Sequence, residues 1–315
     1  MKYPKKVRSF LYNNLKDIFY YRELNDVSGQ KYFIQNPLVL IKSKGFIHFS
    51  DGFKLKFDKK NKSTVLSIMS FALKQDVHFS LANKQEIGDW VIDYKNDAII
   101  TPSKIWFTLS SFDSLILSET FLFDVHFAGF DLKNKVVIEA GAFVGDTALY
   151  YANNGAKVYS FEPDKANFDL FKENLLLNKR LAKRITPTKA ALGKDGEVQF
   201  QSSSGASSIY TVANKQEIVK SLSLKTVLSK FKIKRPYLLH LDVKGSEWDI
   251  INQNEISKFS KLRIEYTTKI CGKKLGTLEE LIRKLKRHGF KYIRIYKHNG
   301  LRYNLKDHGT IDAQK

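Results

Sequence analysis

The chain has 315 residues, of which 43% are hydrophobic and 13% aromatic, so it can bury a large core and is not a disordered protein. Its net charge of +21 leaves a polyanionic partner, an anionic membrane surface and a lysine-rich proteome open, and the spread of charge along the sequence favours the last. The single cysteine, Cys271, excludes an intramolecular disulfide framework and a cysteine cluster for zinc. No apolar segment reaches the roughly 20 residues that span a bilayer, and no signal-peptide core is present. We therefore expect a cytoplasmic protein.

Residues 1–110 are predicted to form an N-terminal extension rich in β-structure. Basic residues flank an apolar stripe with helical spacing, which predicts an amphipathic helix that docks on the protein's own core or, less favoured, on a membrane surface. The stripe consists of Leu11, Leu15, Ile18 and Phe19. Alternating apolar residues predict a β-hairpin over residues 44–58 and a second strand pair around residues 89–101. This extension is expected either to cap the second domain and select its substrate or to act as a structural lid.

The second domain is expected to cover residues 111–315 and to begin with a helix over residues 111–127. It is organised around residues 136–152, which read VVIEAGAFVGDTALYYA. A β-branched run, two glycines and then helical spacing predict a strand, a tight turn and a helix. Gly141 lets the backbone turn without a Cβ clash, and Gly145 opens a helix whose N–H groups favour a negative group of a ligand.

A dinucleotide site is disfavoured at this turn, because Phe143 stands where a second glycine would let the backbone approach a pyrophosphate. A ligand without phosphates, such as S-adenosylmethionine, needs less clearance. An ordinary turn between strand and helix stays open as the alternative. The next predicted strand, residues 157–162, ends in Glu162, at the distance where α/β nucleotide sites place a carboxylate against a ribose diol. Pro163 and Asp164 then predict the start of a helix that ends near residue 178.

The next segment, residues 184–192, is predicted as a strand, and a short strand over residues 198–201 is predicted within a polar loop. A helix is predicted over residues 223–231 and a buried strand over residues 237–243. Asp242 lies at the carboxyl end of the buried strand. Ligands of open α/β sheets bind at that edge, so we expect Asp242 to face Gly141 across a crevice, with an N-cap for the next helix as the alternative role. His240, in the middle of this strand, is interpreted as a core histidine.

Four motifs in this order resemble the FkbM family of S-adenosylmethionine-dependent methyltransferases. They read IEAGAFVGDTALYYA, YSFEPD, ENLLLN and HLDVKGSE, and the resemblance covers residues 111–295. It implies a class I methyltransferase fold, which is an α/β, Rossmann-like, doubly wound and mostly parallel sheet. It also implies methyl transfer to a hydroxyl oxygen. The family usually carries Glu where this chain has Lys244, and we interpret Lys244 as a solvated side chain.

The resemblance implies two sets of site residues. The expected contacts to S-adenosylmethionine are Glu139, Gly141, Ala142, Gly145, Asp146, Thr147, Glu162, Pro163, Ala190 and Asp242. The expected catalytic residues are Asp242, as first candidate for a general base, with Glu247 and Glu265 in reserve. No metal ligand is assigned.

The last third of the sequence predicts a helix near residues 246–251, a strand over residues 262–266 and a helix over residues 277–289 that begins with a capping box at Thr277. A closing strand pair is expected over residues 290–296 and 301–305.

The expected function is methylation of a hydroxyl group on a sugar, glycan or small molecule. The sequence LDVKGS differs from the N/D-P-P-Y/F loop of families that methylate amide or base nitrogens, which favours a hydroxyl acceptor. An RNA methyltransferase is a second interpretation, motivated by the net charge. A cofactor-binding accessory protein or a membrane-surface adaptor is a third, because Lys244 stands where an acid is expected.

Overall fold

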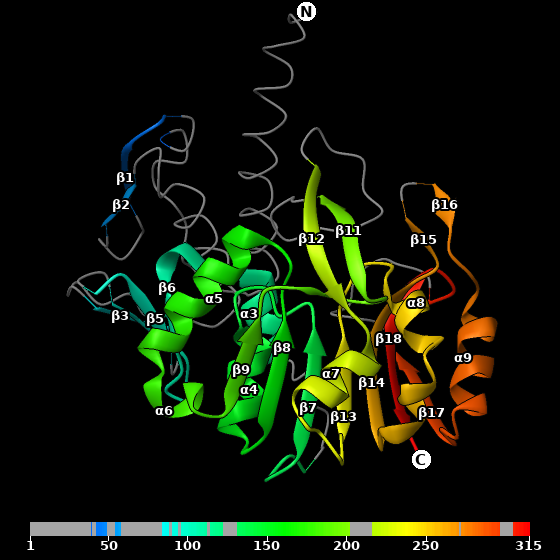
Figure 1. Cartoon of the computed structure of the whole chain (residues 1–315). Helices are drawn as coiled ribbons and strands as arrows, with labels where there is room; N and C mark the ends of the chain where they lie inside the picture. Colours follow the sequence, from blue (N-terminus) through cyan, green and yellow to red (C-terminus); the bar gives the residue numbers. More distant parts are fainter. Residues whose placement is uncertain are drawn as a thin grey trace, which may run out of the picture. The chain divides into compact units, whose positions relative to one another are not determined.

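Figure 1 shows the computed structural model of the chain, coloured along the sequence. It describes residues 39, 42–48, 54–57, 84–87, 90–93, 96–111, 114–121, 131–201, 216–270, 272–296 and 305–315. The chain divides into two compact units, Met1–Ser118 and Glu119–Lys315, and the division falls within helix α3 (Ser114–Phe121). The amphipathic helix expected near the N-terminus lies outside the described residues. The roles expected for residues 1–110 and 111–315 stay predictions.

The first unit contains two antiparallel sheets. Strands β1 (Gly45–His48) and β2 (Lys54–Phe57) pair with Gly45 opposite Phe57, which confirms the predicted hairpin. A four-stranded sheet has the order β3 (Lys84–Ile87), β4 (Trp90–Asp93), β5 (Ala98–Ile100) and β6 (Trp106–Thr108), and its β4–β5 pair is the predicted second strand pair. A short 3-10 helix, Leu109–Ser111, comes next in the chain.

The second unit is built on a seven-stranded sheet in the order β17-β18-β14-β13-β7-β8-β9 (Figure 1). These strands are β7 (Val136–Ala140), β8 (Lys157–Phe161), β9 (Ile185–Thr188), β13 (Leu238–Leu241), β14 (Lys261–Thr267), β17 (Tyr292–Tyr296) and β18 (His308–Gln314). Six of these strands run in the same direction, and β18 runs opposite to them. The central strands carry almost continuous apolar runs, as expected for parallel strands covered on both faces. The predicted doubly wound α/β fold is confirmed.

Helices cover both faces of this sheet. They are α4 (Asp146–Asn153), α5 (Lys165–Leu177), α6 (Lys179–Ala182), α7 (Leu224–Lys230), α8 (Glu247–Ile251) and α9 (Leu278–Arg287), with a 3-10 helix at Asn254–Lys258. Apolar residues of α7, α8 and α9 form one core cluster with Ile138, Leu239 and Ile264. On the other face, Tyr151 of α4 packs edge-on against His240. Helix α9 begins with the predicted capping box, Thr277 and Glu280.

The strand predicted over residues 184–192 is present but shorter, because β9 ends at Thr188, where the chain leaves the sheet. Pro187 lacks an N–H donor, which suits β9 to the edge of the sheet. The chain then forms a separate three-stranded sheet whose order is β10, β12, β11. Its strands are β10 (Ala191–Leu192), β11 (Gly196–Gln201) and β12 (Gln216–Leu222). The sequence pattern predicted only a shorter β11 and did not predict β12.

The predicted closing pair needs a second correction. β17 pairs with β18, whereas residues 301–304 lie outside the described part of the chain and Leu305 lies in a turn. β18 separates β17 from β14, because Ile311 and Ala313 bury apolar side chains in the sheet between them. The small hairpin of β15 (Lys269–Ile270) and β16 (Lys273–Lys274) comes directly after β14. No helix of the described residues is both long and apolar enough to cross a membrane.

Candidate active site

The turn after β7 brings two strand ends into contact. Gly141 has φ +85°, and a Cβ atom at this position would lie 1.9 Å from the backbone carbonyl oxygen of Asp242. The N–H groups of Gly141 and Ala142 both donate to the carbonyl oxygen of Phe161, at 3.0 and 3.1 Å. Gly141 is therefore required by close packing of backbones as well as by its φ angle. Asp242 lies next to Gly141, as expected, but the two backbones pack closely where the sequence predicted a crevice between them.

Helix α5 supports the second half of this turn. Gly145, with φ +82°, is the N-cap of α4, and a Cβ there would lie 2.0 Å from the ring of Phe171. The Asn174 side-chain amide donates to the carbonyl oxygen of Val144 at 2.9 Å. Phe171 and Asn174 thus fix the loop that precedes α4. The sequence gave no sign that Phe171 packs against Gly145.

Glu162 ties β8 to the same turn. Its two carboxylate oxygens accept the N–H groups of Phe143, at 2.8 Å, and of Asp164, at 2.9 Å. Burial raises the pKa of Glu162 to about 8, although both hydrogen bonds act in the opposite direction. Pro163 is half-buried, and Asp164 is the N-cap of α5, as the sequence predicted. Glu162 therefore lies at the expected strand end, with the turn's own backbone as its partner.

Asp146 and Thr147, the first residues of α4, are buried. The Asp146 carboxylate accepts hydrogen bonds from the hydroxyls of Thr120, at 2.7 Å, and Thr147, at 3.2 Å. Burial raises the pKa of Asp146 to about 7. Ala190 is buried just beyond β9, where its N–H donates to Thr188. The hydrogen bond between Thr120 and Asp146 thus connects the start of α4 to α3.

Glu139 lies within the sheet, in a polar row formed by side chains in register. Ser160 on β8 donates to Glu139 Oε2 at 2.7 Å, and His240 Nδ1 on β13 lies 3.6 Å from Glu139 Oε1. All three side chains are buried. Glu139 thus supports the strand that leads to Gly141, and His240 is part of the core, as the sequence interpretation held.

Asp242, Lys244 and Glu265 form a charged cluster at the carboxyl ends of β13 and β14. Lys244 Nζ lies 3.1 Å from Asp242 Oδ1 and 2.9 Å from Glu265 Oε1, and His308 Nε2 lies 3.3 Å from the same Glu265 oxygen. Burial opposes the charge on Lys244, but the two carboxylates outweigh it and raise the pKa of Lys244 above its ordinary value. Asp242 is 25% exposed and Glu265 6%. The interpretation of Lys244 as a solvated lysine is wrong, because its charge is paired with both acids.

The loop that carries Lys244 has an unusual backbone. Lys244 has φ +46° and Gly245 has φ +109°. A lysine rarely adopts a positive φ, and such strain concentrates at functional sites. Asp242 is not the N-cap residue of the next helix, because the N-cap of α8 is Ser246. The alternative role of Asp242 as an N-cap is thereby removed.

Glu247 connects this loop to β14. It is fully buried, and its oxygens accept the N–H groups of Gly245, at 2.6 Å, and Thr267, at 2.9 Å. Burial raises the pKa of Glu247 to about 7. Since both oxygens hold backbone donors, Glu247 is a positioning residue for Lys244 and for the end of β14. The sequence alone did not show whether Glu247 positions the loop or serves as an alternative general base.

The raised pKa of Glu247 has a consequence for stability. The folded protein binds this proton more tightly than the unfolded chain, so the contribution is complete below about pH 4.5 and is lost as the pH rises through about 7. The wild-type protein should lose about 2 kcal/mol of its free energy of unfolding between pH 5 and pH 8 through this group, and its melting temperature should fall accordingly. We expect Glu247→Gln to show a smaller fall of melting temperature over the same range. Thermal unfolding across this pH range measures it. Glu173→Gln, at an exposed position of α5, is the control. An unchanged slope in Glu247→Gln would contradict the prediction.

Known proteins resemble this chain in family and in fold. Residues 139–292 match the family model described as the methyltransferase FkbM domain. A search of the curated proteins gives no match. Three solved structures illustrate the similarity found by fold. Precorrin-6y C5,15-methyltransferase from Geobacter metallireducens has 15% identity and a TM-score of 0.35, and the alignment covers 63% of this chain and 86% of that one.

The other two structures are equally distant in sequence. Aeropyrum pernix fibrillarin in complex with S-adenosyl-L-methionine has 13% identity and a TM-score of 0.36, with 59% and 70% of the two chains covered. The METTL16 MTase domain has 10% identity and a TM-score of 0.41, with 95% of this chain and 92% of that one covered.

The strand order of the sheet, its one antiparallel strand and the glycine turn at the carboxyl end of β7 define a class I, Rossmann-like methyltransferase fold. S-adenosylmethionine is the methyl donor of this class. More particularly, residues 139–292 match the model of the methyltransferase FkbM domain, which confirms the resemblance in the sequence.

The residues at the turn fit S-adenosylmethionine chemically. Glu162 lies at the end of β8, where a ribose contact is expected, and each of its oxygens, which accepts one backbone N–H, has a second lone pair for a ribose hydroxyl. Asp242 provides a partly exposed carboxylate near Gly141 for a positively charged group. Among the described residues, no group of three or more His, Cys, Asp and Glu side chains is arranged to hold a metal ion. Sequence reasoning missed the roles of Thr120 and His308, because neither lies within a motif.

Proposed function

We propose that the protein transfers the methyl group of S-adenosylmethionine to a hydroxyl oxygen of a sugar, glycan or small molecule. The observation that carries the proposal is the Asp242 carboxylate, 25% exposed, at the strand edge where the chain also places Gly141. A partly exposed carboxylate at this edge suits a general base for a weakly acidic hydroxyl. The FkbM domain supports methyl transfer as the reaction class.

Most of the proposed catalysis is positioning. When bound, S-adenosylmethionine supplies an activated methyl group on a positively charged sulfur, and the products are a methyl ether and S-adenosylhomocysteine. Asp242 accepts the hydroxyl proton as the new C–O bond forms. Lys244 holds the Asp242 and Glu265 carboxylates in place and offsets part of their charge. Glu247 fixes the loop on which Lys244 lies. An in-line displacement with an activated donor gains most from holding the acceptor oxygen in place.

The sequence features support further parts of the proposal. The single cysteine supports a reducing compartment, and we place the protein in the cytoplasm. The loop LDVKGS lacks the sequence typical of enzymes that methylate amide or base nitrogens, which supports a hydroxyl acceptor over an RNA base.

Transfer of labelled methyl groups tests the acceptor class. The purified protein is incubated with S-adenosylmethionine labelled in its methyl group, together with separate pools of glycans, small hydroxyl compounds, lipids and RNA. We expect label in a hydroxyl compound as a methyl ether, which resists mild base and so differs from a methyl ester. Label found only in nuclease-sensitive RNA would overturn the hydroxyl-acceptor proposal. Micromolar binding of S-adenosylmethionine without transfer to any pool would favour an accessory role.

A further inference from the structure

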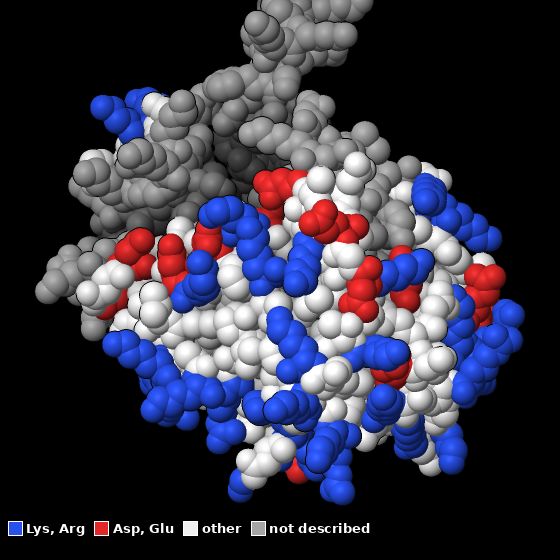
Figure 2. Space-filling view, in the orientation of Figure 1, with Lys and Arg blue, Asp and Glu red and all other residues white. Residues whose placement is uncertain are grey.

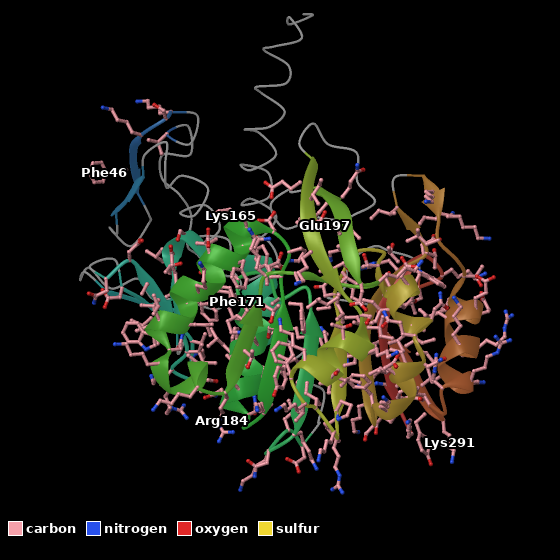
Figure 3. The ribbon with its side chains drawn as sticks, viewed as in Figure 1. Phe46, Lys165, Phe171, Arg184, Glu197 and Lys291 are labelled. Atoms are coloured by element: carbon pink, nitrogen blue, oxygen red, sulfur yellow. The ribbon has the colours of Figure 1, made fainter. Side chains whose placement is uncertain are left out.

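Positive charge is concentrated at one edge of the central sheet. Figure 2 shows Lys and Arg side chains along the lower edge of the molecule, where the strands of the sheet begin. Figure 3 shows Arg184 and Lys291 pointing away from the sheet at this edge. We use the name basic edge for six exposed residues that stand before or at the start of five strands of the sheet. They are Lys133, Lys157, Arg184, Lys234, Arg235 and Lys291.

The charge of the basic edge is not neutralised locally. No carboxylate in the described part of the chain forms an ion pair within 4.0 Å with any of the six residues. Some lysines elsewhere on the surface are paired, as in Lys165 and Lys172 with Asp169 at 2.5 and 2.8 Å, and others, such as Lys220 and Lys274, are exposed like those of the basic edge. A set of like charges repel one another, so the arrangement costs stability unless an external anion balances it.

Helix ends account for only part of the basic edge: Arg184 donates to the carbonyl oxygen of Gly155, just after the end of α4, at 3.1 Å. A cation in the last turn of a helix is stabilised by the carbonyl end, which explains Lys286 and Arg287 in α9. None of the six residues lies in a helix. An anionic partner that covers the beginnings of several strands at once would balance the charge of the other five residues.

Exposed apolar side chains at the same edge favour a membrane as the anionic partner. Leu176 and Leu177 are 69% and 41% exposed at the end of α5, where the chain turns into α6 and continues to Arg184. Tyr292 is 71% exposed next to Lys291. Leucines and a tyrosine beside lysines suit the boundary between lipid headgroups and acyl chains, whereas single-stranded RNA is held mainly by aromatic stacking.

We propose that the basic edge docks the protein onto a membrane surface that contains anionic lipids. The glycine turn and Asp242 lie at the carboxyl ends of the strands, at the opposite edge of the sheet. Docking through the basic edge thus leaves the candidate active site facing away from the lipid. The surface is distinct from the amphipathic helix expected near the N-terminus.

Vesicle sedimentation with the full chain tests this docking. The variant Lys133→Gln/Lys157→Gln/Arg184→Gln/Lys234→Gln removes four charges from the basic edge. Its control, Lys220→Gln/Lys225→Gln/Lys273→Gln/Lys274→Gln, removes four exposed lysines elsewhere, so both keep the same net charge and N-terminal segment. We expect the wild type to bind vesicles with 30% phosphatidylserine but not phosphatidylcholine vesicles. The basic-edge variant should lose at least about tenfold in binding, while the control changes less than about threefold.

A second variant separates lipid from other polyanions. Leu176→Ser/Leu177→Ser keeps every charge, and it should weaken vesicle binding several-fold while leaving binding to random-sequence RNA unchanged. Equal vesicle binding by the basic-edge variant and its control would overturn the proposal. Wild-type binding to RNA but not to vesicles would also overturn it. Since methyl transfer is measured separately, failure here leaves the proposed reaction untouched.

Discussion

Replacement of Gly141 by alanine is expected to weaken binding of S-adenosylmethionine by up to about a hundredfold, because relief of an overpacked contact costs about 1–3 kcal/mol and here displaces the site itself. The new Cβ would lie 1.9 Å from the carbonyl oxygen of Asp242 and 2.8 Å from its carbonyl carbon. Both contacts are with backbone, so the ends of β7 and β13 must move apart. Titration calorimetry with S-adenosylmethionine and S-adenosylhomocysteine measures the loss.

A matched control separates this contact from backbone strain. Gly272 has φ +78°, close to the +85° of Gly141, but a Cβ there would have no heavy atom within 4 Å. Alanine at a left-handed position costs about 1–2 kcal/mol whatever its surroundings. Gly272→Ala should therefore lose a similar amount of stability from strain alone and keep its affinity. Equal affinities of the two variants would show that the approach of Gly141 to Asp242 does not govern binding.

Asp242→Asn is expected to reduce turnover by about 10²–10⁴-fold, the range typical of a lost general base. Asparagine has almost the same shape, but its amide is not a base at neutral pH. Lys244 keeps its contact with Glu265 at 2.9 Å, so the loop should stay in place. Initial rates with an identified acceptor, together with calorimetry, separate turnover from binding. The affinity for S-adenosylmethionine should fall by only about tenfold, the effect of losing one hydrogen bond to a charged group.

Asp249→Asn provides the comparison for Asp242→Asn. Asp249 is 40% exposed on α8 and lies 4.0 Å from Lys194, away from the charged cluster. It should keep its full turnover. If Asp242→Asn also keeps full turnover, Asp242 is not the base, and catalysis by positioning alone would explain the rate.

The order of the central strands could be predicted because each carries a local signal. Buried parallel strands are continuous apolar runs, and Gly141 and Gly145 mark the turn by their position between strand and helix. The contact between Gly141 and Asp242 could be predicted from a general rule of open α/β sheets, although the two residues are far apart in sequence.

The state of the charged groups could not be predicted in the same way. Lys244 appears in the sequence as one of many lysines, and its pairing with Asp242 and Glu265 depends on a positive φ angle and on the neighbouring end of β14. The basic edge is hidden for a related reason. Its residues lie far apart in the sequence, apart from the adjacent Lys234 and Arg235. They come together in space only because parallel strands begin at the same edge of the sheet.

The position of β18 between β14 and β17 also governs the order in which the sheet can form. β14 and β17 do not pair with each other, and each depends on residues 308–314, which come later in the chain than both. Until those residues arrive, β14 is an open edge, and the contact between Glu265 and His308 does not exist. The half of the sheet that carries Gly141, Glu162 and Asp242 can close earlier, since β7, β8 and β13 pair among themselves. The strands that carry Gly141, Glu162 and Asp242 can thus pair before the chain is complete, whereas the surroundings of Glu265 form last.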